Sequence, residues 1–163
     1  MHHTEIVNHT TVLPDPELPI ARIRRVFDAP PAAVVRAHTD ASLLEQWAGP
    51  DADQFVIHRW DARTGGAWRI TDHGRLRYGS FHEVGPERIV RTVSWEDRPE
   101  EVTLEILTFI DLHDGRTRVV TESLSNSFEA RDGWLASGHV ERATAAHERL
   151  SALLAEQATT VKA

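Results

Sequence analysis

The sequence predicts an α+β fold in which a curved antiparallel sheet wraps around one long helix near the C-terminus. From residue 53 to residue 124, apolar residues recur with a period of about two, and short polar turns separate the runs. This pattern is typical of successive antiparallel strands. After residue 125 the apolar spacing changes to three and four residues, which is typical of an amphipathic helix. The apolar face of the sheet and the apolar stripe of the helix are expected to bury each other.

The long helix is expected to run from Asn126 to Leu154 as one near-continuous segment, with Gly138 approaching the sheet. Asn126 and Glu129 stand three residues apart, as in a variant of the capping box. A helix of this length spans roughly 40 Å at 1.5 Å per residue. Its apolar stripe carries histidines and alanines where large apolar residues would fill a core, and consists of Leu135, His139, Ala143, Ala146, His147, Leu150 and Leu153 or Leu154.

The chain is expected to form a single domain over residues 20–156. Residues 1–19 are polar and contain prolines, so we expect a loosely ordered lead-in with one short edge segment at Thr10 to Leu13. Residues 157–163 are expected to form a C-terminal tail. Two short helices are predicted at Pro31 to His38 and Ala41 to Trp47, and strands at Ile20 to Phe27, Phe55 to Trp60, Ala67 to Thr71, Leu76 to Val84, Arg88 to Trp95, Val102 to Leu112 and Thr117 to Leu124.

Composition and charge narrow the class of protein. A length of 163 residues with 40% hydrophobic residues suits one soluble domain with its own core. The formal net charge is −7, and no basic stripe with interleaved aromatic residues is present, so nucleic acid is not an expected partner. We expect neither a signal peptide nor membrane insertion, since no apolar run is long enough. Cysteine is absent, which excludes thiol catalysis and makes the cytoplasm the expected location.

Several short motifs occur in a fixed order along the chain. They are Phe27-Asp-Ala-Pro30, Ala37-x-Thr39-Asp40, Gln46-Trp47-x-Gly49-Pro50, Asp61-x-Arg63-x-Gly65-Gly66-x-Trp68 and Pro86-Glu-Arg-Ile89, continued in the long helix by Glu129-Ala-Arg-Asp132 and Ser137-Gly138. In this order and spacing they resemble the SRPBCC (START/Bet v 1-like) superfamily. Within it they resemble most the Hsp90-ATPase-activator-like (AHSA1-like) branch. The resemblance covers roughly residues 20–155.

The resemblance implies a helix-grip fold, in which about seven antiparallel strands curl around the C-terminal helix and two small helices close one end. It also implies a deep cavity between sheet and helix, which relatives use for lipids, polyketides, hormones or other apolar molecules. The branch often has tryptophan or another bulky residue where His38, Ala48 and Ala143 stand, and Met and Leu where His139 and His147 stand. Lost bulk that nothing else fills costs about 3–5 kcal/mol per ring, so we expect the resulting space to be used.

The candidate ligand-binding residues are the side chains expected to line that cavity, whose volume should reach about 300–1,000 Å³. His58 and Trp60 stand two residues apart on one strand, so they share a face of the sheet. The resemblance implies apolar residues at these two positions, so we expect both side chains to point inward. The histidines have a simpler alternative interpretation, as core residues hydrogen-bonded to Ser, Thr or a backbone carbonyl. The candidate set is His38, Trp47, His58, Trp60, Trp68, Phe81, Trp95, His139, Ala143 and His147.

We expect a protein that binds an apolar or aromatic small molecule inside this cavity, as a monomer or homodimer and without a cofactor. A cyclase, aromatase or dehydratase that uses cavity histidines for proton transfer is a second interpretation. An Hsp90-type protein-interaction module, suggested by the resemblance, is a third. The sequence leaves open whether any reaction is catalysed, so no catalytic residue is assigned.

His139 and His147 are not expected to share a metal ion. They stand eight residues apart, which separates their Cα atoms by roughly 12 Å along a helix, whereas a ligand nitrogen lies about 2 Å from its ion. No metal site is therefore predicted. Burial lowers the pKa of a histidine and a carboxylate such as Glu83 raises it. We expect their titration to change ligand affinity or turnover between about pH 5 and 8.

Overall fold

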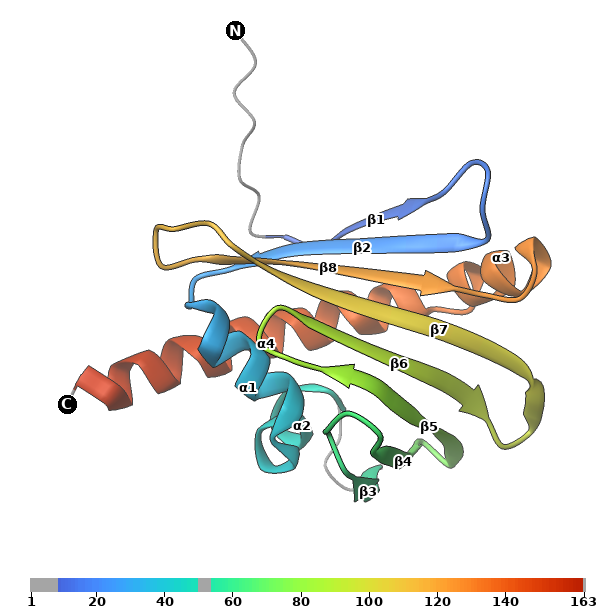
Figure 1. Cartoon of the computed structure of the whole chain (residues 1–163), viewed down its shortest axis with the longest axis horizontal. Coiled ribbons are helices and arrows are strands. Elements are labelled where there is room, and N and C mark those ends of the chain that lie inside the picture. Colours follow the sequence, from blue (N-terminus) through green and yellow to red (C-terminus); the bar gives the residue numbers. More distant parts are fainter. Residues whose placement is uncertain (1–8, 50–53, 163) are drawn as a thin grey trace, which may run out of the picture.

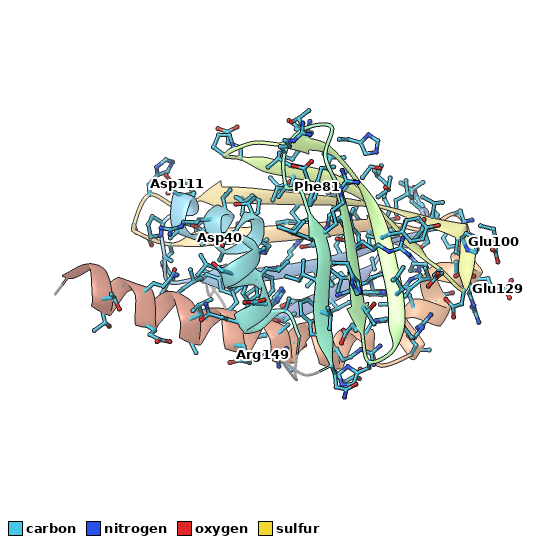
Figure 2. All side chains as sticks on the ribbon, turned by 90° about the horizontal axis from the view of Figure 1, so that it is seen from below. Asp40, Phe81, Glu100, Asp111, Glu129 and Arg149 are labelled. Carbon is cyan, nitrogen blue, oxygen red and sulfur yellow. The ribbon has the colours of Figure 1, made fainter. Side chains whose placement is uncertain are left out.

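The computed structural model describes residues 9–49 and 54–162, which form an antiparallel sheet with helices packed against it (Figure 1). The predicted helix-grip arrangement is confirmed, since the C-terminal helix α4 (His139–Lys162) runs along the curled sheet. The view from below in Figure 2 shows α4 along one side of the molecule, with side chains filling the space between it and the strands. This arrangement places the inner face of the sheet toward α4.

Within the described residues, the sheet contains eight strands in the order β1-β2-β8-β7-β6-β5-β4-β3, with every neighbouring pair antiparallel. Strands β3 to β8 form the expected meander, and β2 pairs with β8. The edge strand β1 overlaps the short edge segment expected at Thr10 to Leu13 within the lead-in of residues 1–19. The strands are β1 (Thr11–Pro14), β2 (Ile20–Phe27), β3 (Phe55–Trp60), β4 (Ala67–Asp72), β5 (Arg75–Val84), β6 (Arg88–Trp95), β7 (Arg98–Asp111) and β8 (Thr117–Leu124).

Two short helices, α1 (Pro31–Thr39) and α2 (Ala41–Trp47), follow β2 as predicted. Asp40 caps α2, because its carboxylate accepts a hydrogen bond from a backbone N–H of the first turn at 2.9 Å. Trp47 at the end of α2 donates its indole N–H to the carbonyl oxygen of Ala37 at 2.9 Å. This bond fixes the two helices relative to each other, and the apolar residues of both join the main core.

The prediction of one continuous helix from Asn126 to Leu154 is wrong, because the chain forms two helices there. The first, α3 (Phe128–Ala136), is separated from α4 by a turn at Gly138, whose φ is +87°. Glycine adopts this left-handed conformation without a steric penalty and commonly ends a helix in this way. Ser127 caps α3 in place of Asn126. A Cβ atom on Gly138 would meet side chains of α4, so the expected approach to the sheet does not occur.

Helix α4 buries the predicted leucines and continues through residues 157–162, which we expected to be a tail. Leu150, Leu153 and Leu154 are buried in the main apolar core together with Phe27. Towards its N-terminal end, α4 instead presents histidine and alanine to the sheet, so the core is less filled there. Among the described residues, none of the helices is long and apolar enough to cross a membrane.

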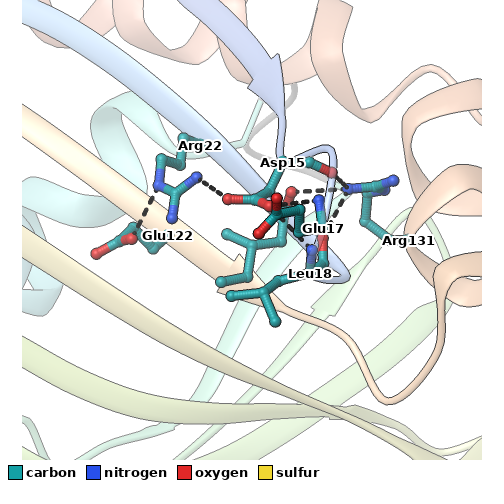
Figure 3. Close-up of polar contacts among 7 residues, drawn as sticks. Asp15, Glu17, Leu18, Arg22, Glu122 and Arg131 are labelled. Atoms are coloured by element: carbon teal, nitrogen blue, oxygen red, sulfur yellow. Dashed lines mark hydrogen bonds and ion pairs between the residues drawn. The ribbon is translucent and has the colours of Figure 1, made fainter.

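Arg131 ties α3 to the loop between β1 and β2 (Figure 3). Its Nη1 atom lies 2.8, 3.1 and 3.0 Å from the carbonyl oxygens of Asp15, Leu18 and Ile20. The loop is also held by Arg22, which donates to the Asp15 carboxylate at 2.6 Å. That hydrogen bond is the main reason why the pKa of Asp15 is lowered to about 2. Because Arg131 is buried and satisfies three carbonyl oxygens, it fixes α3 to this edge of the sheet.

Candidate functional site

A cavity of about 270 Å³ lies between the inner face of the sheet and α4, and α1 and α2 contribute to its lining. The volume falls just below the range of about 300–1,000 Å³ that we expected. The cavity is nevertheless rich in aromatic surface, because every tryptophan of the chain contributes to it. These are Trp47, Trp60, Trp68, Trp95 and Trp134.

Three of these tryptophans, Trp47, Trp60 and Trp68, form an apolar wall. Their indole N–H groups donate to backbone carbonyl oxygens at 2.9, 2.9 and 3.2 Å, respectively. An indole has a single donor, so the remaining ring surface is purely apolar. The Trp60 and Trp68 rings meet edge to face with their centroids 6.0 Å apart. This wall suits contact with an apolar or aromatic molecule.

Another part of the lining is polar and was missed by the sequence reasoning. Arg91 donates to the Oε1 atom of Glu105 from Nε at 2.8 Å and from Nη2 at 2.7 Å. Arg77 reaches the cavity from β5, where it has the same strand parity as Gly79 and Phe81. The strand parity that placed Phe81 inside could therefore have placed Arg77 there too. The other polar residues of this part are Asp72, Thr103, Thr121, Ser123 and Ser125.

A row of ring and guanidinium contacts runs from Arg75 on the sheet to both C-terminal helices, and its other members, Trp95, His139 and Trp134, line the cavity. The Arg75 guanidinium lies 4.2 Å from the ring centroid of Trp95, and this ring lies 6.0 Å from that of His139. His139 in turn stacks on Trp134 of α3. The row connects β5 and β6 with the two helices on either side of Gly138, and both aromatic and cation–π contacts stabilise it.

His38 is a core histidine with its hydrogen bond satisfied, as in the simpler interpretation. Its Nδ1 donates to the carbonyl oxygen of Val34 at 2.8 Å. Its ring packs edge to face against Trp47 and Phe109. Burial is the main cause that lowers the pKa of His38 to about 4. The side chain therefore presents a neutral ring edge to the cavity.

His139 and His147 line the cavity from α4, but they are also neutral at ordinary pH. Burial, followed by the charges of Arg142 and other arginines, lowers the pKa of His139 to about 4. Burial also lowers the pKa of His147 to about 3. The Nδ1 atom of His139 is hydrogen-bonded to Arg142 at 3.0 Å, and that of His147 to the Thr10 hydroxyl at 2.9 Å. Glu83 pairs with an arginine at the surface instead. In the free protein these lowered pKa values place the titration of both histidines below the window of about pH 5 to 8, so a dependence of ligand affinity on pH in that window stays a prediction.

Two candidate residues do not reach the cavity. His58 is exposed, and its Nε2 lies 2.7 Å from the Thr71 hydroxyl. The expectation that it points inward with Trp60 is wrong because a β-bulge between Ile57 and Arg59 shifts the alternation by one residue. Phe81 is buried in the core and contacts Trp60 edge to face. It supports the apolar wall from behind.

Small side chains on α4 leave room for the cavity. Ala143 lines it one helical turn from His139 and one from His147, as the spacing predicts. Ala145 and Ala146 contribute as well. Of the ten candidate residues, those in the lining are His38, Trp47, Trp60, Trp68, Trp95, His139, Ala143 and His147.

The curled sheet, the long C-terminal helix and the cavity between them define a helix-grip protein. The chain belongs to the family of Activator of Hsp90 ATPase homolog 1-like proteins, whose family model matches residues 28–155. The family suggested by the sequence motifs is therefore confirmed. A search of curated proteins found no significant match.

Solved structures with the same fold cover between 72% and 91% of the chain. A protein from Mycobacterium smegmatis is 26% identical, with a TM-score of 0.77, over 90% of this chain and 96% of its own. A protein from Rhodobacter sphaeroides is 22% identical, with a TM-score of 0.78, over 91% of this chain and 99% of its own. An Hsp90 activator from Plasmodium falciparum is 19% identical, with a TM-score of 0.57, over 72% of this chain and 87% of its own. At such identities the last two show the shared fold alone.

Proposed function

We propose that this protein binds a small apolar or aromatic molecule in the cavity between the sheet and α4. The observation that carries the proposal is the gathering of all five tryptophans around a space of about 270 Å³. Protein cores are normally close-packed, with few voids larger than a water molecule. An aromatic lining around such a space is typical of a ligand site, although its volume falls just below the usual range of about 300–1,000 Å³.

The size and lining of the cavity limit the ligand class. The volume lies just below the usual range of ligand sites, which favours a molecule with one or two rings over a long lipid. Trp47, Trp60 and Trp68 offer ring surface without free N–H donors. A flat aromatic body would therefore be held by ring contacts and dispersion at this wall.

The test is to fill the cavity from α4. Ala143→Trp places an indole in the space, whereas Ala152→Trp adds the same group on the exposed side of α4. With the neutral two-ring dye 6-propionyl-2-(dimethylamino)naphthalene, we expect Ala143→Trp to weaken binding more than tenfold, about 1.4 kcal/mol. Ala152→Trp should bind like the unchanged protein, and both variants should remain folded by circular dichroism. Equal dye binding by the two variants would show that the dye site lies elsewhere.

The two other functions considered from the sequence receive less support. A cyclase, aromatase or dehydratase would need a base near neutral pH, but the pKa values of His139 and His147 lie near 4 and 3. Activity on Hsp90 would rest on a shared fold with the Plasmodium falciparum activator at 19% identity, and fold does not determine function. We further propose that the protein acts in the cytoplasm as a monomer or homodimer.

A further inference from the structure

Arg77 differs from the other charged side chains of the cavity in having no polar partner. Its Nε atom is completely buried and makes no hydrogen bond. Among the described residues, no carboxylate or carbonyl oxygen pairs with its guanidinium, which lies 5.9 Å from the centroid of the Trp95 ring. Arginine stays protonated in proteins, so a positive charge without a direct ion pair lies in the cavity lining. Buried charges are normally paired or hydrogen-bonded.

The two carboxylates of the lining are engaged by other groups. Glu105 accepts two hydrogen bonds from Arg91. Asp72 lies 2.7 Å from the Nδ1 of His73 at the tip of the β4–β5 hairpin. Both carboxylates favour the charged form of Arg77 from a distance, but burial and the charges of Arg91 and Arg142 oppose it and the pKa of Arg77 is lowered. The surroundings therefore do not neutralise this guanidinium.

Arginines outnumber carboxylates in the cavity lining, although the chain carries a formal charge of −7. Its lining contains two carboxylates and five arginines, Arg77, Arg91, Arg131, Arg142 and Arg149. Apart from Arg77, each of these arginines donates a hydrogen bond to another group of the protein. Arg131 and Arg149 donate to backbone carbonyl oxygens, and Arg142 donates to His139. An anionic group that enters the cavity would meet one unoccupied guanidinium in a positive field.

We infer that Arg77 is a binding residue for the anionic group of an aromatic or apolar organic acid, such as a carboxylate. This inference rests on the proposed function and adds the chemical class of its ligand. The guanidinium presents a planar set of donors that matches a carboxylate. The carboxylate would lie at Arg77 near Trp95, and the apolar body would extend along the wall formed by Trp47, Trp60 and Trp68.

The experiment compares two probes that differ in charge and share nearly the same shape, 2-naphthoate and 2-naphthamide. Binding is followed at neutral pH by quenching of the intrinsic fluorescence, since all five tryptophans line the cavity. We expect the protein to bind 2-naphthoate at least tenfold more tightly than 2-naphthamide. Arg77→Gln should abolish this preference, so that both probes bind with similar affinity. Arg77→Met provides a second variant whose apolar stem retains packing.

The matched control is Arg69→Gln, which removes the same charge from an exposed side chain on the neighbouring strand β4. It should keep the full preference for 2-naphthoate. Equal affinities of the unchanged protein for both probes, or a preference that survives both Arg77 variants, would overturn the role of Arg77 and leave the apolar ligand site standing. Binding of neither probe would overturn the proposed function and this inference together.

Discussion

The imidazole of His139 lies parallel to the indole of Trp134, with ring centroids 5.0 Å apart and planes 8° apart, although a helix break separates the two residues. The turn at Gly138 redirects the chain so that the last turn of α3 lies over the first residue of α4. Both rings also line the cavity. The helix break is therefore part of how the lining is built, and not merely an interruption of a long helix.

Replacement of Gly138 by alanine should destabilise the protein, because its φ of +87° is unfavourable for a residue with a Cβ atom. We expect the free energy of unfolding to fall by about 1–2 kcal/mol, measured by urea denaturation. Gly133→Ala is the matched control, because Gly133 lies inside α3 with open space around it. Alanine there should stabilise the helix by about 0.5–1 kcal/mol. A Gly138→Ala variant as stable as the unchanged protein would contradict a strained turn at this position.

Stability should decrease as the pH is lowered from about 6.5 towards 4, because of the buried histidines. The pKa values of His38, His139 and His147 are lowered from 6.5 to about 4, 4 and 3 in the folded protein. Between pH 6.5 and the lowered pKa values, the unfolded chain binds more protons than the folded protein does. The contribution of these histidines to the free energy of unfolding is therefore fully present above pH 6.5 and is lost as the pH falls through this window.

Urea denaturation at about pH 7.5 and about pH 5.5 checks this dependence, since carboxylates with ordinary pKa values stay largely ionised over that range. The control is the double variant His139→Leu with His147→Leu. It should be at least as stable at the higher pH, because polar burial is removed, and should lose less stability on acidification. If the double variant loses as much as the unchanged protein, these two histidines do not cause the effect.

The strands and the two short helices could be predicted from the sequence because their signals are local. Period-two alternation and turns such as Asp114-Gly115 define them without knowledge of the partner strands. The position of His58 could not be predicted in this way, because the bulge in β3 exists only in its pairing with β4. The break at Gly138 was missed because its flanks keep an apolar spacing that fits a continuous helix.

The candidate site was predicted in its apolar part and missed in its polar part. The tryptophans were found because large aromatic residues on a sheet face are expected inside. Arg77 and Arg91 were overlooked because arginine is normally exposed, although strand parity places both toward the interior. Lys162 is the chain's single lysine, so nearly all basic residues are arginines. The sequence alone does not distinguish the few arginines that enter the cavity from those at the surface. The charge of the site therefore became visible only with the fold.

The most direct test of a ligand site between sheet and α4 is the nuclear magnetic resonance spectrum of the indole N–H groups. The chain has five tryptophans and all line the cavity, so each indole signal reports on it. On addition of 2-naphthamide, we expect the signals of Trp60 and Trp68 to shift and saturate, while the backbone signal of the exposed Arg69 stays in place. If the probe binds but none of the five indole signals moves, the bound molecule lies outside this cavity and the proposed function is contradicted.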